Sequence, residues 1–297
     1  MTQLPDFLQA LPGQPVRVHP PQGVVLPLVC DSPHSGTHYP ADFGVAVPLA
    51  LLRRGEDSHV HTLWDALPAY GATLIEATFP RTYIDPNRTE GDINPAMLEG
   101  AWPVPLSPGP KTLQGLGLVW ERISQAGQAT AIYERKLSVA EVQHRIEAYW
   151  RPYHAAVAQA IRWSVDRFGG VWHMNLHSMP SDVYQRLGRT DAPLLADFVL
   201  GDRDGTTCAP EFIHLIGDTL EGLGYSVAYN EPYKGVALLA EIGQPHLNRH
   251  SLQIEINRPI YMDEATREPN AGFEPLRQNL QKVMEVVADY VRQQQRS

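Results

Sequence analysis

The sequence predicts an α/β protein with a mixed, mostly parallel central sheet and helices on both faces. Short apolar runs alternate along the chain with longer segments of helical period, which is the pattern of such sheets. Several of these runs carry polar residues that packing does not explain, as in TLIEATFPR, VWHMNLHSM and LQIEINR. The 297 residues, 43% of them hydrophobic, can bury one large core, so we expect a single domain over residues 1–297.

Each predicted strand is an apolar run bounded by turn residues. The strands are predicted at residues 24–30, 73–79, 171–177, 196–200, 225–229 and 252–257. The run at 171–177 alternates clearly, since His173, Asn175 and His177 share one face and the apolar residues between them the other. The first run leads into a turn-rich loop that contains His34. Ligands bind at the carboxyl ends of strands in open α/β sheets, so this edge is the predicted site.

The predicted helices have apolar residues at helical spacing and recognisable ends. They are predicted from residue 49 to a break at Gly55, and at residues 57–70, 138–167, 211–222 and 273–296. Ser138 and Glu141 form a capping box. The first twenty-odd residues, rich in Pro and Gln, are predicted to be a loosely held lead-in. Residues 90–117 are rich in Gly and Pro, and loops of that length usually cover a functional site.

Composition excludes several classes of function. The formal net charge is −9 and no block of five basic residues occurs, so we expect no nucleic-acid partner. No apolar run reaches 18 residues, and the N-terminus lacks the basic and apolar regions of a signal peptide, so we expect a cytoplasmic protein that does not enter a membrane.

Three residues are candidates for a metal site. His34 and His177 follow or end apolar strands, and Asp57 lies near a predicted helix start, so all three can meet at one sheet edge. Imidazole nitrogen and carboxylate oxygen are zinc ligands, and catalytic zinc sites use three protein ligands. Each residue taken singly could instead be an ordinary hydrogen-bonded core residue.

His173 shows why the secondary structure matters. On a helix, His173 and His177 would share a face and could share a metal. On a strand they are about 13 Å apart. The alternation favours the strand, so we interpret His173 as structural.

Glu255 and Arg258 end the last predicted strand. Glu255 could belong to a solvated outer face, as is usual on an edge strand, or it could be a buried general base beside a metal site. The sequence leaves these two interpretations open. Arg258 could pair with Glu255 or bind an anion.

Arg81, Asn87 and Arg88 lie in the segment RTYIDPNR after the second predicted strand. A guanidinium offers a bidentate fork for a carboxylate, so these residues suit the recognition of an acidic substrate. The alternative is surface ion pairing of the two arginines with Asp85 or Glu90.

Seven segments resemble the N-formylglutamate amidohydrolase family and occur in the family's order. They are SPHSG, GED, RTYIDPNR, NLHSMPS, GDRDG, NEPYKG and LQIEINRPIYMDE, spread over residues 32–264. The resemblance implies a metal-dependent amidohydrolase with one Zn²⁺ per chain and a fold similar to those of zinc carboxypeptidases and aspartoacylases. It implies hydrolysis of N-formyl-L-glutamate to L-glutamate and formate, a step in histidine breakdown.

The resemblance also implies roles for particular residues. His34 and His177 match the metal-binding histidines, Glu255 the general base, and Arg81 and Arg88 the substrate-binding arginines. Asp57 matches the carboxylate ligand, with the adjacent Glu56 as the alternative, because Thr37 rather than Glu stands three residues after His34. Val236 follows the NEPYKG segment where a second glycine is expected. Two other functions stay open: hydrolysis of another N-acyl amino acid or short peptide, and non-catalytic binding on the same fold.

Overall fold

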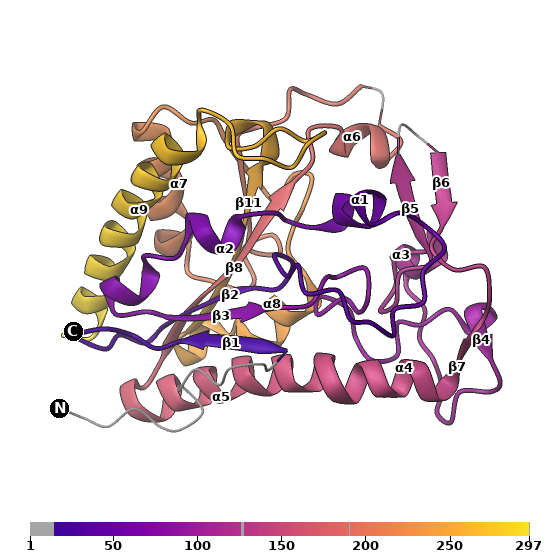
Figure 1. Ribbon diagram of the computed structural model, residues 1–297. Coiled ribbons are helices and arrows are strands. Elements are labelled where there is room, and N and C mark those ends of the chain that lie inside the picture. The colour runs from indigo at the N-terminus through magenta and orange to yellow at the C-terminus, as the bar shows by residue number, and fades with distance from the viewer. Residues whose placement is uncertain (1–14, 126–127, 190, 297) are drawn as a thin grey trace.

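A seven-stranded sheet forms the centre of the computed structural model, which describes residues 15–125, 128–189 and 191–296 (Figure 1). Its strand order is β1-β3-β2-β8-β11-β9-β10. The strands are β1 Val16–His19, β2 Leu28–Ser32, β3 Thr73–Ala77, β8 Val171–Met179, β9 Phe198–Gly201, β10 Val227–Tyr229 and β11 Arg249–Asn257. Within this sheet the β1–β3 and β11–β9 pairs are antiparallel, and the other pairs are parallel. The predicted mixed, mostly parallel sheet is confirmed.

Helices cover both faces of the sheet, as predicted (Figure 1). One face packs against α2 Val60–Leu63, α7 Pro210–Gly222 and α9 Phe273–Gln294. The other face packs against α4 Val139–Arg145, α5 Arg151–Phe168 and α8 Ala237–Ile242. The two-residue alternation of the strands supplies both cores, since Trp172, Met174 and Leu176 of β8 belong to the first.

The capping box forms as the sequence predicts. Ser138 Oγ accepts a hydrogen bond from Glu141 N, and Glu141 Oε2 accepts one from Ser138 N. A π-helical turn, Ile146–Trp150, joins α4 to α5, and α5 ends at Gly169 with φ 74°. Gly169 adopts this left-handed conformation without steric cost.

The N-terminal part of the sheet differs from the prediction. The prediction of a loosely held lead-in is wrong from residue 16 onward, because β1 pairs with β3 in the sheet. Residues 1–14 lie outside the described residues. The next strand, predicted at 24–30, is displaced toward its carboxyl end as β2. Val24 is 71% exposed, whereas Asp31 and Ser32 are fully buried. Hydrogen bonding inside the protein keeps these polar residues in the strand, and an apolar pattern does not reveal that.

Three loop and helix assignments also change. The break at Gly55 is confirmed, but the helix predicted at 57–70 is wrong: His59 precedes α2 with φ 66°, and a second short helix follows. The excursion at residues 90–117 contains two short helices and a two-residue strand. The sequence does not predict the antiparallel strands 122–125 and 128–131 that follow it. The remaining elements are α1 Leu49–Leu52, η2 Arg53–Gly55, η3 Leu67–Tyr70, η4 Pro95–Met97, β4 Leu98–Glu99, α3 Pro110–Leu113, β5 Arg122–Gln125, β6 Gln128–Ala131, β7 Leu137–Ser138, α6 Val183–Arg186, η6 Pro245–Leu247 and η7 Arg258–Ile260.

Among the described residues, no helix has the length and apolar character needed to cross a bilayer.

A buried polar cluster lies in the sheet beneath α5. His173 Nδ1 is 2.8 Å from Ser251 Oγ, and His173 Nε2 is 2.8 Å from Asp31 Oδ1. Tyr153 and Asn175 also donate to the Asp31 carboxylate. Burial opposes the charge on Asp31, but the bond from His173 and its other donors lower the pKa of the carboxyl. Ser251, His173 and Asp31 are hydrogen-bonded in the sequence of a Ser-His-Asp catalytic triad. All three are inaccessible to solvent, so the cluster is structural.

We expect the substitution His173→Leu to lower the free energy of unfolding by about 3 kcal/mol, because it removes one partner of a buried charge and of a buried hydroxyl. Denaturant unfolding measures the loss. The matched control is His246→Leu, at an exposed histidine. A loss within about 0.5 kcal/mol, as for a surface substitution, would contradict the structural role of the cluster.

Candidate active site

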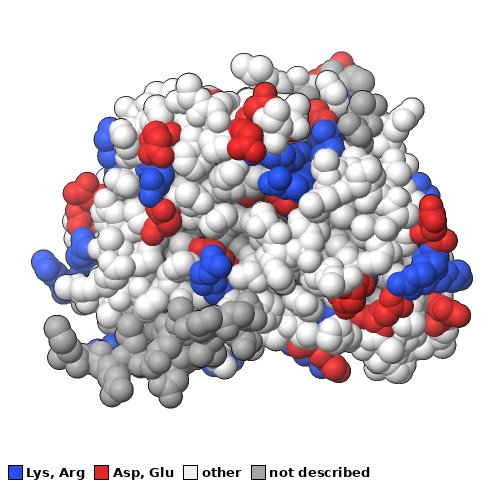
Figure 2. Space-filling model, in the orientation of Figure 1, with Lys and Arg blue, Asp and Glu red and all other residues white. Residues whose placement is uncertain are grey.

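One cavity of about 740 Å³ is lined by every residue that the sequence predicts for the site. These residues are His34, Asp57, Arg81, Asn87, Arg88, His177, Glu255 and Arg258. Figure 2 shows this face of the molecule hollowed near its centre, with lysine and arginine side chains gathered at the edge of the hollow. Residues far apart in the sequence therefore meet at the predicted edge of the sheet.

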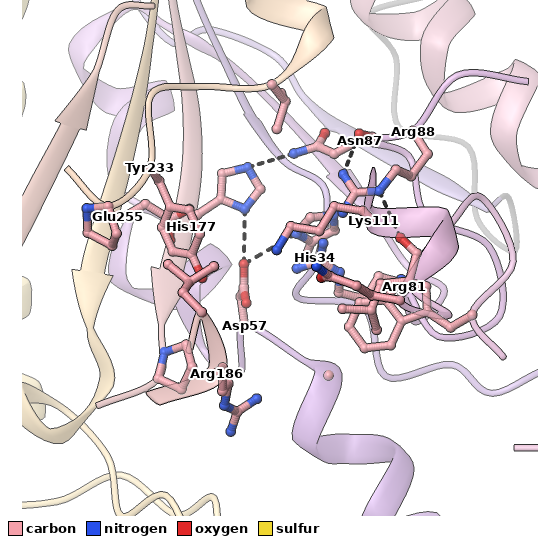
Figure 3. A pocket seen from close by; sticks show the side chains of 18 of the residues that line it. His34, Asp57, Arg81, Asn87, Arg88, Lys111, His177, Arg186, Tyr233 and Glu255 are labelled. Atoms are coloured by element: carbon pink, nitrogen blue, oxygen red, sulfur yellow. Dashed lines mark hydrogen bonds and ion pairs between the residues drawn. The ribbon is translucent and has the colours of Figure 1, made fainter. Parts of the chain in front are cut away.

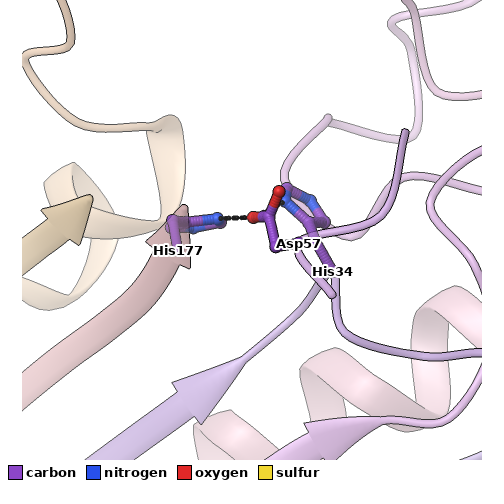
Figure 4. A group of neighbouring side chains, drawn as sticks. All are labelled: His34, Asp57 and His177. Atoms are coloured by element: carbon purple, nitrogen blue, oxygen red, sulfur yellow. Dashed lines mark hydrogen bonds and ion pairs between the residues drawn. The ribbon is translucent and has the colours of Figure 1, made fainter. Parts of the chain in front are cut away.

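Two neighbouring parallel strands and one loop bring His34, Asp57 and His177 together (Figure 4). His34 follows the end of β2, and His177 lies in the last third of β8. Asp57 lies in the turn between η2 and α2. That turn is held against the His34 loop, because Asp57 N donates to His34 O and Ser35 Oγ donates to Asp57 O.

The geometry of these three side chains suits a metal ion. Asp57 Oδ2 is 3.0 Å from His177 Nδ1 and 3.4 Å from His34 Nδ1, and one ligand atom of each residue lies within 4.8 Å of the others. Ligand atoms about 2.1 Å from a tetrahedral ion are roughly 3.4 Å apart. All three residues are buried, and His34 Nδ1 has no hydrogen-bond partner among the described residues. Two imidazole nitrogens and a carboxylate oxygen are thus positioned for one cation.

The other ring nitrogen of each histidine faces a polar partner that orients it. His34 Nε2 is 2.9 Å from Asp85 Oδ1. His177 Nε2 is 2.6 Å from Asn175 Oδ1 and 2.9 Å from Asn87 Nδ2. Such partners fix the tautomer and the ring orientation of metal-binding histidines, and they direct both Nδ1 atoms at Asp57.

Sequence reasoning did not find these supporting roles. Asn175 precedes His177 by two residues and shares its strand face, so the alternation contained the necessary signal. For Asp85, the sequence suggests only a surface ion pair with an arginine. It is instead fully buried, and it accepts hydrogen bonds from Trp120 Nε1 and Arg81 as well as contacting His34.

The structure separates Asp57 from its neighbour Glu56. Burial opposes the charge on Asp57, but His177, His34 and Arg258 outweigh it and hold the pKa of the carboxyl well below its usual range. The Glu56 carboxylate accepts hydrogen bonds from Tyr39, Arg53 and Ser58. The metal-ligand candidate is therefore Asp57. Glu56 instead stabilises the turn between η2 and α2 through these hydrogen bonds.

Arg258 lies beside Asp57 rather than pairing with Glu255. Its Nη2 donates to Asp57 Oδ1 over 2.8 Å, and its Nε donates to Ser178 Oγ over 3.2 Å. One carboxylate oxygen of Asp57 is thus held by the guanidinium while Oδ2 faces the two histidines. Arg258 also lines the cavity, so its predicted contact with substrate stays a prediction.

Glu255 lies on an inner strand, so the interpretation as a solvated edge residue is wrong. β11 is flanked by β8 and β9, and Glu255 is the register partner of His177. The side chain faces the cavity and is buried, and Gln253 Nε2 donates to it. Burial raises the pKa of Glu255 to about 7; the charge of Asp57 adds to the rise, and His177, Arg81 and Arg258 oppose it. A carboxyl that titrates near neutrality suits a general base.

Arg81 and Arg88 face the cavity from one side of the metal-ligand candidates, and Glu255 lies on the other side (Figure 3). Arg81 donates to Asp85 Oδ2 and lies 4.9 Å from the centre of the Trp120 ring. Arg88 does not pair with Glu90, which binds Arg151. Its Nε donates to Leu116 O and its Nη1 to Asn87 O. Arg81 thus forms the ion pair with Asp85 that the alternative names, but Asp85 is buried and the pair is not at the surface, whereas the alternative pairing of Arg88 with Glu90 does not form.

The fold and this cavity define an α/β protein with a candidate metal site at the carboxyl edge of its sheet. The sequence profile of the family N-formylglutamate amidohydrolase matches residues 26–262. The chain belongs to the N-formylglutamate amidohydrolase family. The predicted family and enzyme class, an amidohydrolase, are thereby confirmed.

Individual relatives agree with the family. A protein of Pseudomonas putida named N-formylglutamate deformylase is 28% identical over 267 residues, which are 87% of this chain and 90% of that protein. Its namesake from Pseudomonas aeruginosa is 29% identical over 244 residues, 80% and 83% of the two chains. The crystal structure of N-formylglutamate amidohydrolase from Ralstonia eutropha JMP134 is 57% identical, with a TM-score of 0.91 over 94% of this chain and 99% of that one.

We expect Asp85→Asn to weaken the binding of Zn²⁺ about 10-fold to 100-fold, because the substitution removes the charge that orients His34 through Nε2. Competition with a chromophoric chelator measures the affinity. Glu90→Gln, at a partly exposed carboxylate of the same segment that does not contact His34, is the control. Equal affinities of the Asp85→Asn variant and the wild type would contradict the orienting role of Asp85.

Proposed function

We propose that the protein hydrolyses N-formyl-L-glutamate to L-glutamate and formate with one bound Zn²⁺. The observation that carries the proposal is the grouping of His34, Asp57 and His177 next to Glu255 in one cavity. The names of the relatives, N-formylglutamate deformylase and N-formylglutamate amidohydrolase, support the substrate.

The donor set fits zinc. Two imidazole nitrogens and one carboxylate leave a fourth position for water or substrate, as in catalytic zinc sites. His34 Nδ1 is buried and has no hydrogen-bond partner in the described part of the chain, as expected of a ligand atom directed at a cation. When bound here, zinc supplies a lowered pKa for water and polarisation of a carbonyl oxygen.

Glu255 moves the proton in this mechanism. Its carboxylate removes a proton from the water that attacks the formyl carbon. The same carboxyl then donates this proton to the amide nitrogen as the C–N bond breaks, which yields formate and the free amino group. A pKa near 7 suits both steps, because the group can accept and release a proton at neutral pH. Arg258 keeps Asp57 ionised and oriented throughout.

The charge of the cavity suits an acidic substrate. Eight lysine and arginine residues line it, against four aspartate and glutamate residues, although the chain as a whole is acidic. A cavity lined by positive charge concentrates anions despite the net charge of the protein. Arg81 and Arg88 are the proposed carboxylate-binding arginines, since each guanidinium lies at the cavity wall.

A second candidate substrate is an N-acyl amino acid with a longer acyl group, or a short peptide. The volume of about 740 Å³ favours this alternative, because a drug-sized ligand fits in such a space and a formyl group needs little room. A series of N-acyl-L-glutamates with increasing acyl length distinguishes the two. Non-catalytic binding, the third interpretation, has no support from the relatives, whose names are those of hydrolases.

The first test is formate release from N-formyl-L-glutamate by the purified protein. We expect release to stop after treatment with a chelator and to return when Zn²⁺ is added. The three proposed ligands are side chains of the protein, so they stay in the cavity when the metal is removed and can bind Zn²⁺ again. If folded, zinc-loaded protein releases no formate, N-formyl-L-glutamate is not the substrate.

We expect Glu255→Gln to lower kcat about 10²-fold to 10⁴-fold while the bound zinc is retained, because the variant keeps the shape of the side chain and loses the base. Stopped assays of formate give kcat, and metal analysis gives the zinc content. Glu285→Gln, at an exposed position of α9, is the control. A variant with full activity would exclude Glu255 as the general base.

A further inference from the structure

Lys111 is a cation of the cavity whose side chain has no ion pair or hydrogen bond within the described part of the chain. It lies in α3, inside the excursion at residues 90–117, and it lines the cavity. Several other cations of the cavity have carboxylate partners: Arg258 pairs with Asp57, Arg186 with Asp182 and Lys234 with Asp204. Lys111 is thus free to bind an anion that enters the cavity.

The surroundings of Lys111 are unfavourable for a lone ammonium group. Burial, together with the charges of Arg88 and Arg81, lowers the pKa of Lys111. Like charges gathered in a partly desolvated space repel each other unless an anion lies between them. A bound carboxylate would remove this repulsion and would gain charge-assisted hydrogen bonds.

The position of Lys111 relative to Arg88 is held by the excursion itself. Asp92 accepts hydrogen bonds from Gly109 N and Thr112 Oγ1, on either side of Lys111. Asp92 Oδ2 also lies 3.9 Å from Arg88 Nε. The same Arg88 Nε donates a hydrogen bond to Leu116 O, just beyond α3. The excursion and the arginine therefore form one connected unit that presents both cations to the cavity.

Lys111 lies on the opposite side of the metal-ligand candidates from Glu255. Figure 3 shows Arg81, Arg88 and Lys111 on one side of the Asp57–His177 pair, with Glu255 on the other. Arg81 acts electrostatically on both Glu255 and Lys111. Arg81 is therefore near enough to both Glu255 and Lys111 to act on each of them.

We propose that Lys111 and Arg88 form a subsite for the side-chain carboxylate of the substrate, and that Arg81, nearer to Glu255, binds the α-carboxylate. In an N-acyl glutamate the side-chain carboxylate lies two carbon atoms farther from the scissile amide than the α-carboxylate, which matches this order of cations. The inference rests on the proposed amidohydrolase function. It makes Lys111 the residue that selects acidic over neutral N-formyl amino acids.

The test compares N-formyl-L-glutamate with N-formyl-L-glutamine, which has the same shape and no side-chain charge. Zinc-loaded wild type, Lys111→Met and Lys111→Arg are assayed, with Lys136→Met at an exposed lysine as the control. Lys111→Met is expected to lower kcat/KM for the glutamate substrate about 10-fold to 100-fold, mainly through KM, because a charged hydrogen bond is lost. The glutamine substrate should change less than about twofold, and Lys111→Arg should keep most of the preference.

Two results would overturn the proposed subsite: an equal loss on both substrates, or no loss on N-formyl-L-glutamate. Wild-type protein that releases formate from neither substrate would reject the proposed function instead. Binding is then measured by calorimetry without turnover, with glutarate and its monoamide as probes. A preference for glutarate that disappears in Lys111→Met supports the subsite, and an unchanged or absent preference overturns it.

Discussion

The site depends on the buried carboxylate of Asp57. Removing a charge from water is costly unless other groups compensate, and here two imidazoles and one guanidinium do so. His34, His177 and Arg258 come from segments that follow or end three different strands. Asp57 therefore links the segments at the ends of β2, β8 and β11, which the sheet already holds side by side, next to the wall that carries Glu255.

One face of the central strands changes in character along its length. Near its middle, Asp31, His173 and Ser251 satisfy one another in an inaccessible cluster beneath α5. Farther toward the carboxyl ends, His177 and Glu255 occupy the same face and line the cavity. The same strand periodicity thus supplies a structural polar cluster and then the reacting groups, and exposure to the cavity distinguishes the two.

The acidic chain builds a cationic cavity by pairing most of its positive charges and leaving a few for ligand. Arg81 is shared between the buried Asp85 and the cavity, while the segment around α3 adds Lys111 to the wall. Because Asp92 ties that segment to Arg88, the long excursion acts as part of the site rather than as a surface loop. Charge selection by this cavity is therefore local and does not follow from net charge.

The sequence by itself determined the alternation of strands and helices, the places of His34 and His177 at the sheet edge, and the family, because these depend on local periodicity and on short motifs. Only the tertiary structure decided that Asp57 rather than Glu56 faces the histidines, that Glu255 lies on a buried inner strand, and that Lys111 lines the cavity without an ion-pair partner among the described residues. Each of these depends on neighbours far away in the chain, since burial and ion pairing are properties of the packed protein. Apolar patterns contain no information about such contacts.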